Sequence, residues 1–388
     1  MDNWSFYNPT HIEFCPEGLD RAIRGINYQR IALITTPGFT KRGVVAHLEK
    51  ALVDRLAIVC DTVQPNPDID AIDTTAERLR HIAPDCLIGL GGGSSLDTAK
   101  ALARILTQPE GTALSEHLRA GLPFKNERAL PVITVPTTAG TGSEVTPFAT
   151  VWDFREQKKH SVTGNDLFPI KAILDPTLTL CLPESLTISS GLDAISHALE
   201  SIWNKNANPV SIGLATQSLA ISLKVLPGLK EKPFDLANRS AMMSASLLAG
   251  MAISQTRTAL AHSISYPLTL GFDLPHGIAC SFTLPELLKY NAEADDGRLK
   301  RLAVTLGYED ALELADALKR LLRSLGVSRF LSRCELKEEQ ALALTHEMFT
   351  PGRAVNNLRP ASVEDVHAIV RNAFNAVGSM LNYTDDLF

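Results

Sequence analysis

Short apolar runs alternate with segments of mixed polarity in the first half of the chain. The runs RIALITT, LAIVCDTV, DCLIGLGG and PVITVPTT are rich in Val and Ile, as buried strands are. Between them, GVVAHLEKALVD, AIDTTAERLRHIA and SLDTAKALARILT have apolar residues at helical spacing. Because this alternation is typical of a parallel sheet covered by helices, it predicts an α/β domain from about residue 30 to residue 180.

The second half of the chain has a different pattern. From about Pro183 onward strands are no longer indicated, and ESLTISSGLDAISHALESIW, SIGLATQSLAISLKVLPGLK and EDALELADALKRLLRSLG have the spacing of helices. A chain of 388 residues is long enough for two domains. We therefore predict an α/β domain over residues 1–182 and an all-α domain over residues 183–388, joined near DPTLTLCLPES.

Composition and charge exclude several classes of function. The formal charge is -6, and no basic run is dense enough for nucleic acid or a membrane surface. The six cysteines occur singly, so neither a disulfide framework nor a thiolate zinc site is predicted. The amino terminus lacks the pattern of a signal peptide, and uncharged stretches such as 241–256 are too short for a membrane span. We expect a soluble, cytoplasmic protein that acts on a small molecule.

Two glycine-rich segments follow predicted strands. In CLIGLGGGSSLDTAKAL a strand leads into residues 91–95 and then into a helix predicted to begin near Leu96. Backbone amides at a helix start favour a phosphate, although this pattern is also compatible with a tight turn that binds no ligand. A second run, VPTTAGTGSEVTPF, also follows a strand. Two such loops in one α/β domain favour a cofactor that carries phosphates.

The choice between NAD and NADP usually depends on an acidic residue at the end of a strand, which binds the ribose and repels a 2′-phosphate. The segment RIALITTPGFTKRG has Thr36 at this place, and Lys41 and Arg42 follow. NADP should therefore be tolerated alongside NAD. The two basic residues are equally compatible with solvated helix positions.

Two histidines, His262 and His276, bracket the nearly uncharged stretch LAHSISYPLTLGFDLPHG. Upstream, SSGLDAISHALES places Asp193 and His197 four residues apart, on one face of a predicted helix. Together the four residues provide one carboxylate and three imidazoles, a donor set suited to Fe(II) or Zn(II). Histidines that are hydrogen-bonded in a core without metal are the alternative, and spacing alone does not decide between them.

The motifs GGGSSLDTAK, PTTAGTGSEVT, DAISHALES and PHG resemble, in order and approximate spacing, the iron-containing (group III) alcohol dehydrogenases, over nearly the whole chain. The resemblance implies a Rossmann-like dinucleotide-binding domain and an all-α domain, the dehydroquinate synthase-like fold, with NAD(P)H and one metal ion in a cleft between them. It assigns the metal to Asp193, His197, His262 and His276. It assigns the cofactor pyrophosphate to Gly92, Gly93, Ser94, Asp97, Thr137, Thr138 and Ser143. Thr36, Asn66 and Lys159 complete the predicted cofactor-binding set, with Lys158 as the alternative to Lys159.

One position departs from the family pattern. Members commonly carry HxxxH here, the second histidine helping proton transfer, whereas this chain has His262 followed by Tyr266. The tyrosine hydroxyl lies on the same helical face and could relay a proton, although its ordinary pKa of about 10 makes it a poorer shuttle. We therefore predict His262 and Tyr266 as catalytic residues, with a packing role for Tyr266 as the alternative. Glu200, one turn beyond His197, is expected to be a surface or capping carboxylate, with a contact to a metal ligand as the alternative.

The segment TRTALAHSISYPLT resembles the branch of the family that reduces phosphonoacetaldehyde to 2-hydroxyethylphosphonate, as an enzyme of phosphonate metabolism. A phosphonate needs cationic partners, which Arg257 with Arg353 or Arg359 would supply. On an unbroken helix, however, Arg257 points away from the ligand face, and each arginine is also compatible with a solvated position.

The predicted function is that of a metal-dependent NAD(P)-linked alcohol dehydrogenase or aldehyde reductase, with Fe(II) or Zn(II) polarising the oxygen of a small substrate. Phosphonoacetaldehyde is the predicted substrate, and a general short-chain alcohol or diol dehydrogenase of the lactaldehyde type is the alternative. A dehydroquinate synthase-like lyase and a non-catalytic binding protein are remote alternatives. The resemblance also implies a homo-oligomer, a dimer or larger.

Overall fold

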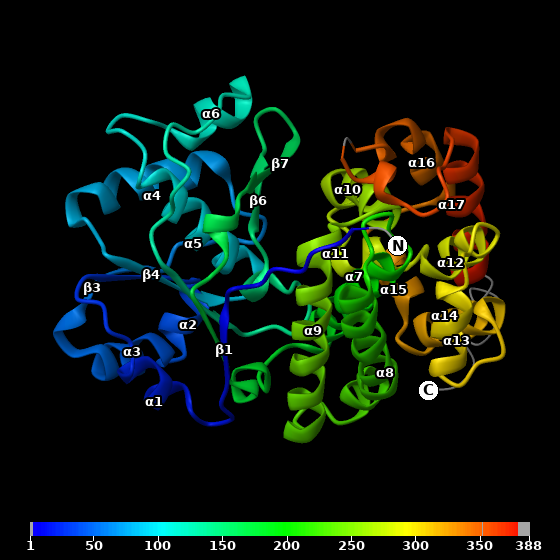
Figure 1. Cartoon of the computed structure of the whole chain (residues 1–388), viewed down its shortest axis with the longest axis horizontal. Helices are drawn as coiled ribbons and strands as arrows, with labels where there is room; N and C mark the ends of the chain where they lie inside the picture. The colour runs from blue at the N-terminus through cyan, green and yellow to red at the C-terminus, as the bar shows by residue number, and fades with distance from the viewer. Residues whose placement is uncertain (1–2, 351, 379–388) are drawn as a thin grey trace. The chain divides into compact units, whose positions relative to one another are not determined.

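The computed structural model describes residues 3–350 and 352–378. The contacts divide the chain into two compact units. The α/β unit is Tyr7–Cys181, and the helical unit comprises the described residues from Leu182 onward together with residues 3–6. These four N-terminal residues differ from the expectation, which placed them in the α/β domain. A parallel sheet in the first unit and helices in the second confirm the predicted fold class (Figure 1).

The helices and strands follow one another as the alternating pattern predicts. The α/β unit contains β1 (His11–Phe14), α1 (Leu19–Arg24), β2 (Ile31–Ile34), α2 (Pro37–Lys41), α3 (Val44–Leu52), β3 (Leu56–Cys60), α4 (Ile69–Ile82), β4 (Cys86–Gly91), α5 (Gly93–Ile105), α6 (Leu114–Ala120), β5 (Val132–Pro136), β6 (Phe148–Asp153), β7 (Lys158–Thr163) and β8 (Lys171–Leu174). The helical unit contains α7 (Glu184–Ile202), α8 (Pro209–Glu231), α9 (Leu236–Thr256), α10 (Leu260–Phe272), α11 (His276–Ser281), α12 (Leu284–Ala292), α13 (Arg298–Thr305), α14 (Ala311–Ser324), α15 (Val327–Arg333), α16 (Glu338–Ala343) and α17 (Val363–Gly378).

The main sheet has the strand order β1-β8-β5-β4-β2-β3, and all of its pairings are parallel. Because side chains alternate along a strand, Leu33 packs with α1 and α3 on one face and Ile34 packs with α4 and α5 on the other. Strands β4 and β5 are neighbours, with Gly91 opposite Pro136 at their carboxyl ends. The two glycine-rich loops therefore leave the same edge of the sheet side by side, where ligands bind in open α/β sheets.

The structure differs from the sequence prediction at two places in this unit. Helix α5 begins at Gly93, with Gly92 as its N-cap, rather than near Leu96. The apolar periodicity starts only at Leu96, whereas small residues fill the first turn, so hydrophobic spacing alone placed the start too late. The antiparallel hairpin of β6 and β7 was not predicted at all.

In the helical unit, α7 packs against α8, α9 and α11. Asn208 caps α8 through a reciprocal pair of hydrogen bonds with Ser211. By length and composition alone, α8 is one helix in the described part of the chain that is long and apolar enough to cross a membrane. The finding is weak evidence for a span, because a core helix of a soluble protein passes the same test.

Candidate metal centre and dinucleotide loops

Helix α7 carries the first two predicted metal ligands on its inner face. Asp193 and His197 are both buried, and the Nε2 atom of His197 lies 3.8 Å from the Oδ1 atom of Asp193. The spacing of four residues brings the two side chains to the same face of the helix. The ring of His197 also stacks on that of His262, with 4.7 Å between the ring centroids.

Glu200, one turn further along α7, connects this helix to the start of α10. Its carboxylate is fully buried and accepts hydrogen bonds from the backbone amides of Ala259, Ala261 and His262. The same carboxylate lies 2.6 Å from Nδ1 of His262. Burial raises the pKa of Glu200. The opposing effect of His262 and of the amides of Ala259 and His262 is larger, so the pKa lies below its ordinary value. The expected surface position was therefore wrong, whereas the capping role is present together with a bond to a predicted ligand.

The bond to Glu200 determines which nitrogen of His262 is available. Since Nδ1 donates to the carboxylate, the lone pair of Nε2 is directed elsewhere. Nε2 lies 3.6 Å from Oδ1 of Asp193, and neither of these two buried atoms has a hydrogen-bond partner in the described structure. An unsatisfied buried polar atom costs about 1–3 kcal/mol, and more when it is charged. A cation between the two atoms removes this cost, so the residues present fit a divalent metal.

Asp193 keeps its charge in this site. Burial alone raises the pKa of its carboxyl group, but His197, His262 and His276 together lower it to a value well below the ordinary one. An ionised carboxylate beside imidazole nitrogens is the donor set expected for Fe(II) or Zn(II).

Helix α11 brings His276 to the same place, and Gly277 makes this possible. A Cβ atom at position 277 would lie 1.8 Å from the carbonyl oxygen of Ser189 on α7, so a larger residue would push the two helices apart. With glycine there, the ring of His276 meets that of His262 edge to face, with 5.3 Å between the centroids. The glycine of the PHG motif therefore permits the contact that assembles the centre.

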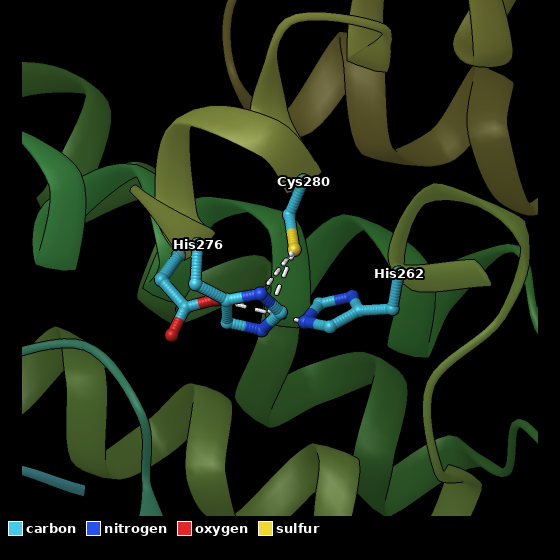
Figure 2. A group of neighbouring side chains, drawn as sticks. His262, His276 and Cys280 are labelled. Atoms are coloured by element: carbon cyan, nitrogen blue, oxygen red, sulfur yellow. Dashed lines mark hydrogen bonds and ion pairs between the residues drawn. The ribbon is translucent and has the colours of Figure 1, made fainter. Parts of the chain in front are cut away.

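Cys280 is the residue of this centre that the sequence analysis missed. It follows His276 by one turn of α11, and its sulfur lies 3.7 Å from Nδ1 and 3.6 Å from Nε2 of that histidine. Figure 2 shows the side chains of His262, His276 and Cys280 converging from α10 and α11. The spacing of four residues from His276 is the sequence signal that points to this cysteine, although it belongs to no CxxC pair.

Tyr266 occupies the position one turn after His262 on α10. Its side chain is 7% exposed, and its ring is nearly parallel to that of His276, with 6.3 Å between the centroids. The tyrosine is therefore both packed in the helical unit and adjacent to the proposed ligands, as its two predicted roles require.

The dinucleotide loops fit closely against one another at the carboxyl ends of β4 and β5. A Cβ atom at Gly93 would lie 2.8 Å from Cγ2 of Thr141, and one at Gly92 would lie 3.2 Å from Cγ2 of Thr138. The backbone amide of Thr137 donates to the carbonyl of Gly91. These contacts bring the predicted pyrophosphate residues of both loops together.

Other predicted cofactor residues are placed around these loops. The amide of Asn66 donates to Oγ of Ser94, which joins the loop after β3 to the start of α5. Ser143 donates to Asp97, whose second oxygen accepts from the amide of Thr150. Asp97 therefore holds the second loop in place.

Thr36 and Lys159 lie apart from these contacts in the sequence, at the ends of other elements. Thr36 is the N-cap of α2, just beyond the end of β2. Lys159 lies on β7, with its Nζ atom 5.0 Å from the centre of the Trp152 ring, whereas the exposed Lys158 pairs with Glu156.

The two arginines predicted for a phosphonate lie beside the segment between α9 and α10. Helix α9 ends at Thr256 and α10 begins at Leu260, so the helix is broken where Arg257 stands and the objection based on an unbroken helix does not apply. Arg257 is exposed and has a positive φ of 62°. Arg353 donates a hydrogen bond to Oγ1 of Thr258, the residue that follows Arg257. Arg359 instead pairs with Glu293 and stacks on a tyrosine.

Comparison with known proteins places this geometry in a family. A family model for iron-containing alcohol dehydrogenase matches residues 9–176, and a model for the C-terminal part of the Fe-containing alcohol dehydrogenase family matches residues 187–374. The chain belongs to the iron-containing alcohol dehydrogenase family. The resemblance inferred from its motifs is thereby confirmed, and the chain is an oxidoreductase of the iron-type alcohol dehydrogenases.

Several members of the family are similar to this chain over most of their length. Phosphonoacetaldehyde reductase of Streptomyces viridochromogenes is 34% identical over 329 residues, which cover 82% of each chain. Sulfoacetaldehyde reductase of Bilophila wadsworthia is 31% identical over 368 residues, 91% of this chain and 94% of the relative. The crystal structure of sulfoacetaldehyde reductase from Bifidobacterium kashiwanohense in complex with NAD+ has a TM-score of 0.89 and 29% identity, covering 96% of this chain and 99% of that one.

Proposed function

We propose that the protein reduces a small aldehyde with NAD(P)H and Fe(II), and that Asp193, His197, His262 and His276 hold the metal. The observation that carries the proposal is the pair of buried atoms without partners, Oδ1 of Asp193 and Nε2 of His262. Zn(II) suits the same nitrogen and oxygen donors and is the alternative cation.

When bound, the cation supplies polarisation of the substrate oxygen and the nicotinamide supplies the hydride. The protein's own contribution is positioning. Glu200 fixes the ring orientation of His262 and also holds the first turn of α10. Burial of Asp193 and His262 keeps water away from these donors. Tyr266 holds its hydroxyl group on the same helix, one turn away, and we assign it the transfer of a proton to or from the substrate oxygen.

For the dinucleotide, we propose that the loops after β4 and β5 bind the pyrophosphate through backbone amides and small hydroxyl groups. Their position at the carboxyl ends of neighbouring parallel strands supports this assignment. Asp97 and Ser143 bond to each other, so we propose that they shape the binding loop. Lys159 is preferred to Lys158 as a cofactor contact, because Lys158 is exposed and paired with Glu156.

The proposed substrate is phosphonoacetaldehyde. Arg257 and Arg353 flank Thr258, just before the helix that carries His262, and a doubly charged group would suit two guanidinium partners. Sulfoacetaldehyde is the second candidate, because sulfoacetaldehyde reductases are among the similar proteins and their substrate is also a two-carbon aldehyde with an anionic head group.

The test measures NADH and NADPH oxidation by the Fe(II)-loaded protein with phosphonoacetaldehyde, sulfoacetaldehyde, propanal and lactaldehyde. We expect kcat/KM for phosphonoacetaldehyde to exceed that for propanal at least 100-fold, about 2.7 kcal/mol of transition-state stabilisation. Arg257→Ala and Arg353→Ala should reduce this preference, whereas Arg359→Ala is the matched control. Equal rates for all aldehydes would indicate a general aldehyde reductase, and no rate with any of them would support a binding protein.

We also propose that the protein is cytoplasmic and forms a homo-oligomer of two or more copies, as the family resemblance implies. Sedimentation of the purified chain measures the oligomeric state directly. A species with the mass of one chain at micromolar concentration would contradict this part of the proposal.

A further inference from the structure

We propose that Cys280 is a metal-binding residue, whose sulfur completes a four-donor site with Asp193, His262 and His276 for thiophilic divalent cations such as Zn(II) and Co(II). The inference rests on the proposed metal centre and adds a donor to it. Ligand atoms of these four residues all lie within 4.8 Å of one another. Asp193, His262 and Cys280 are fully or almost fully buried.

The distances agree with a tetrahedral arrangement. Zinc binds imidazole nitrogen at about 2.1 Å and thiolate sulfur at about 2.3 Å, which places two such donors about 3.6 Å apart at the tetrahedral angle. The sulfur of Cys280 lies 3.6 Å from Nε2 of His276. Oδ1 of Asp193 and Nε2 of His262 are also 3.6 Å apart and have no hydrogen-bond partner among the described residues. For the oxygen–nitrogen pair the tetrahedral separation is about 3.4 Å. Both pairs of donors thus lie within about 0.2 Å of the separation that one tetrahedral cation requires.

Helix α11 holds the sulfur of Cys280 on the same side as the imidazole of His276. Cys280 and His276 are four residues apart on α11, so their side chains lie on the same face. Gly277 fixes the distance of that helix from α7, and with it the distance of both donors from Asp193. Binding exchanges the thiol proton for the metal: the S–H bond breaks, a sulfur–metal bond forms, and the proton leaves to solvent without any redox change.

The centre therefore offers two donor sets. For the catalytic cation, His197 would be a ligand together with Asp193, His262 and His276. For a thiophilic cation, Cys280 would take the place of His197 beside Asp193, His262 and His276. Softness of the thiolate favours Zn(II) and Co(II) over cations that prefer oxygen.

The experiment adds Co(II) to the metal-free full-length protein in equimolar amount. Wild-type protein should show thiolate-to-cobalt charge-transfer absorption. Cys280→Ser should lose this absorption, keep the ligand-field bands of bound Co(II), and bind Zn(II) at least tenfold more weakly. Cys334→Ser is the matched control, because Cys334 lies in the same unit outside the four-donor cluster, and it should behave as wild type.

A second measurement is independent of any variant. X-ray absorption at the zinc edge of the wild-type protein should show one sulfur at about 2.3 Å. Bound Co(II) without the thiolate band, or zinc surrounded by nitrogen and oxygen alone, would overturn the role of Cys280 and leave the catalytic cation site standing. Failure of Co(II) to bind, or binding that Asp193→Asn leaves unchanged, would overturn the metal centre itself and this inference with it.

Discussion

Each unit buries ionisable side chains, and Lys100 in the α/β unit differs from the pair Asp193 and His262 in the helical unit in how its hydrogen bonds are satisfied. In the α/β unit, the ammonium group of Lys100 lies 2.9 Å from the carbonyl oxygen of Ser143 and 2.6 Å from that of Phe148. It also lies 3.3 Å from Asp97. In the helical unit, by contrast, Asp193 and His262 each present a buried atom without such a partner in the described structure.

The difference separates a structural network from a ligand site. A buried charge that is fully hydrogen-bonded joins parts of the fold, as Lys100 joins α5 to the loop before β6. A buried charge whose partner is missing destabilises the protein until a ligand supplies one. Substitution of the fully hydrogen-bonded Lys100 should therefore affect stability. Substitution of Asp193 or His262 should affect metal binding and activity.

The largest expected effect comes from the pair Asp193 and His262, whose buried atoms have no hydrogen-bond partner in the described structure. Asp193→Asn should reduce kcat/KM about 10³-fold or more, because loss of the cation removes several kcal/mol of transition-state stabilisation. Metal content by elemental analysis should fall in parallel, while the Tm of the metal-free protein should not decrease. A lower Tm in the metal-free protein would instead place Asp193 in a structural network.

In the Lys100 network, Lys100→Met should lower the free energy of unfolding of the α/β unit by about 3–5 kcal/mol, since it leaves the buried carbonyls of Ser143 and Phe148 without their donor and removes the cation beside Asp97. Urea denaturation followed by circular dichroism measures this change. Lys50→Met, at an exposed position on α3, is the control and should unfold as wild type does. Unchanged stability of Lys100→Met would remove the distinction between the two groups.

Tyr266→Phe examines proton transfer separately from metal binding. Loss of the hydroxyl group should lower kcat about 100-fold, the lower end of the range for general acid–base catalysis. Metal content and Tm should stay the same, because the ring packing is kept. Steady-state kinetics with unchanged kcat would leave Tyr266 with a packing role alone.

Glu200→Gln should weaken metal binding about 10- to 100-fold, the usual cost of altering a residue that orients a metal-ligating histidine. A chelator competition titration measures the affinity. Glu184→Gln is the matched control, because Glu184 lies exposed on the same helix. Equal affinities for the two variants would show that the bond to His262 does not tune the metal.

The smallest effect concerns Glu144, whose pKa is raised to about 7 by burial, with Lys100 opposing the shift. A carboxyl group with a raised pKa in the folded state stabilises it at low pH, and this contribution is lost as pH rises through about 7. The unfolding free energy should therefore fall by at most about 1.4 kcal/mol per pH unit between the ordinary pKa of a glutamate and about 7. Glu144→Gln should flatten the dependence in urea denaturation at pH 5, 6, 7 and 8. A slope unchanged by this substitution would exclude Glu144 as its source.

The alternation of strands and helices was readable in the sequence because buried parallel strands are almost continuously apolar, as in residues 31–34 and 86–91. The four predicted metal ligands came from local spacing together with the family motifs. Glu200 and Cys280 were misjudged or missed for a common physical reason. The bond of Glu200 to His262, and the proximity of Cys280 to Asp193 and His262, depend on the packing of α7, α10 and α11, which no local pattern specifies.

The same limit applies to the hairpin of β6 and β7. Its second strand reads KKHSVT, which is polar and only partly buried, so neither alternation nor an apolar run marks it as a strand. Gly277 illustrates the limit at a single residue. Its motif was noticed, but the reason for glycine is the carbonyl of Ser189 from a distant part of the sequence.

The carboxylate of Glu200 has a further consequence, because it bonds both to the first amides of α10 and to the imidazole of His262. Order in the first turn of that helix and affinity for the cation are then thermodynamically linked, and each strengthens the other by the same free energy. Metal loading should slow hydrogen exchange of the Ala259 and Ala261 amides, although neither residue is a ligand. If His262 holds the metal as proposed, the exchange rate of these amides would report whether the protein carries its metal.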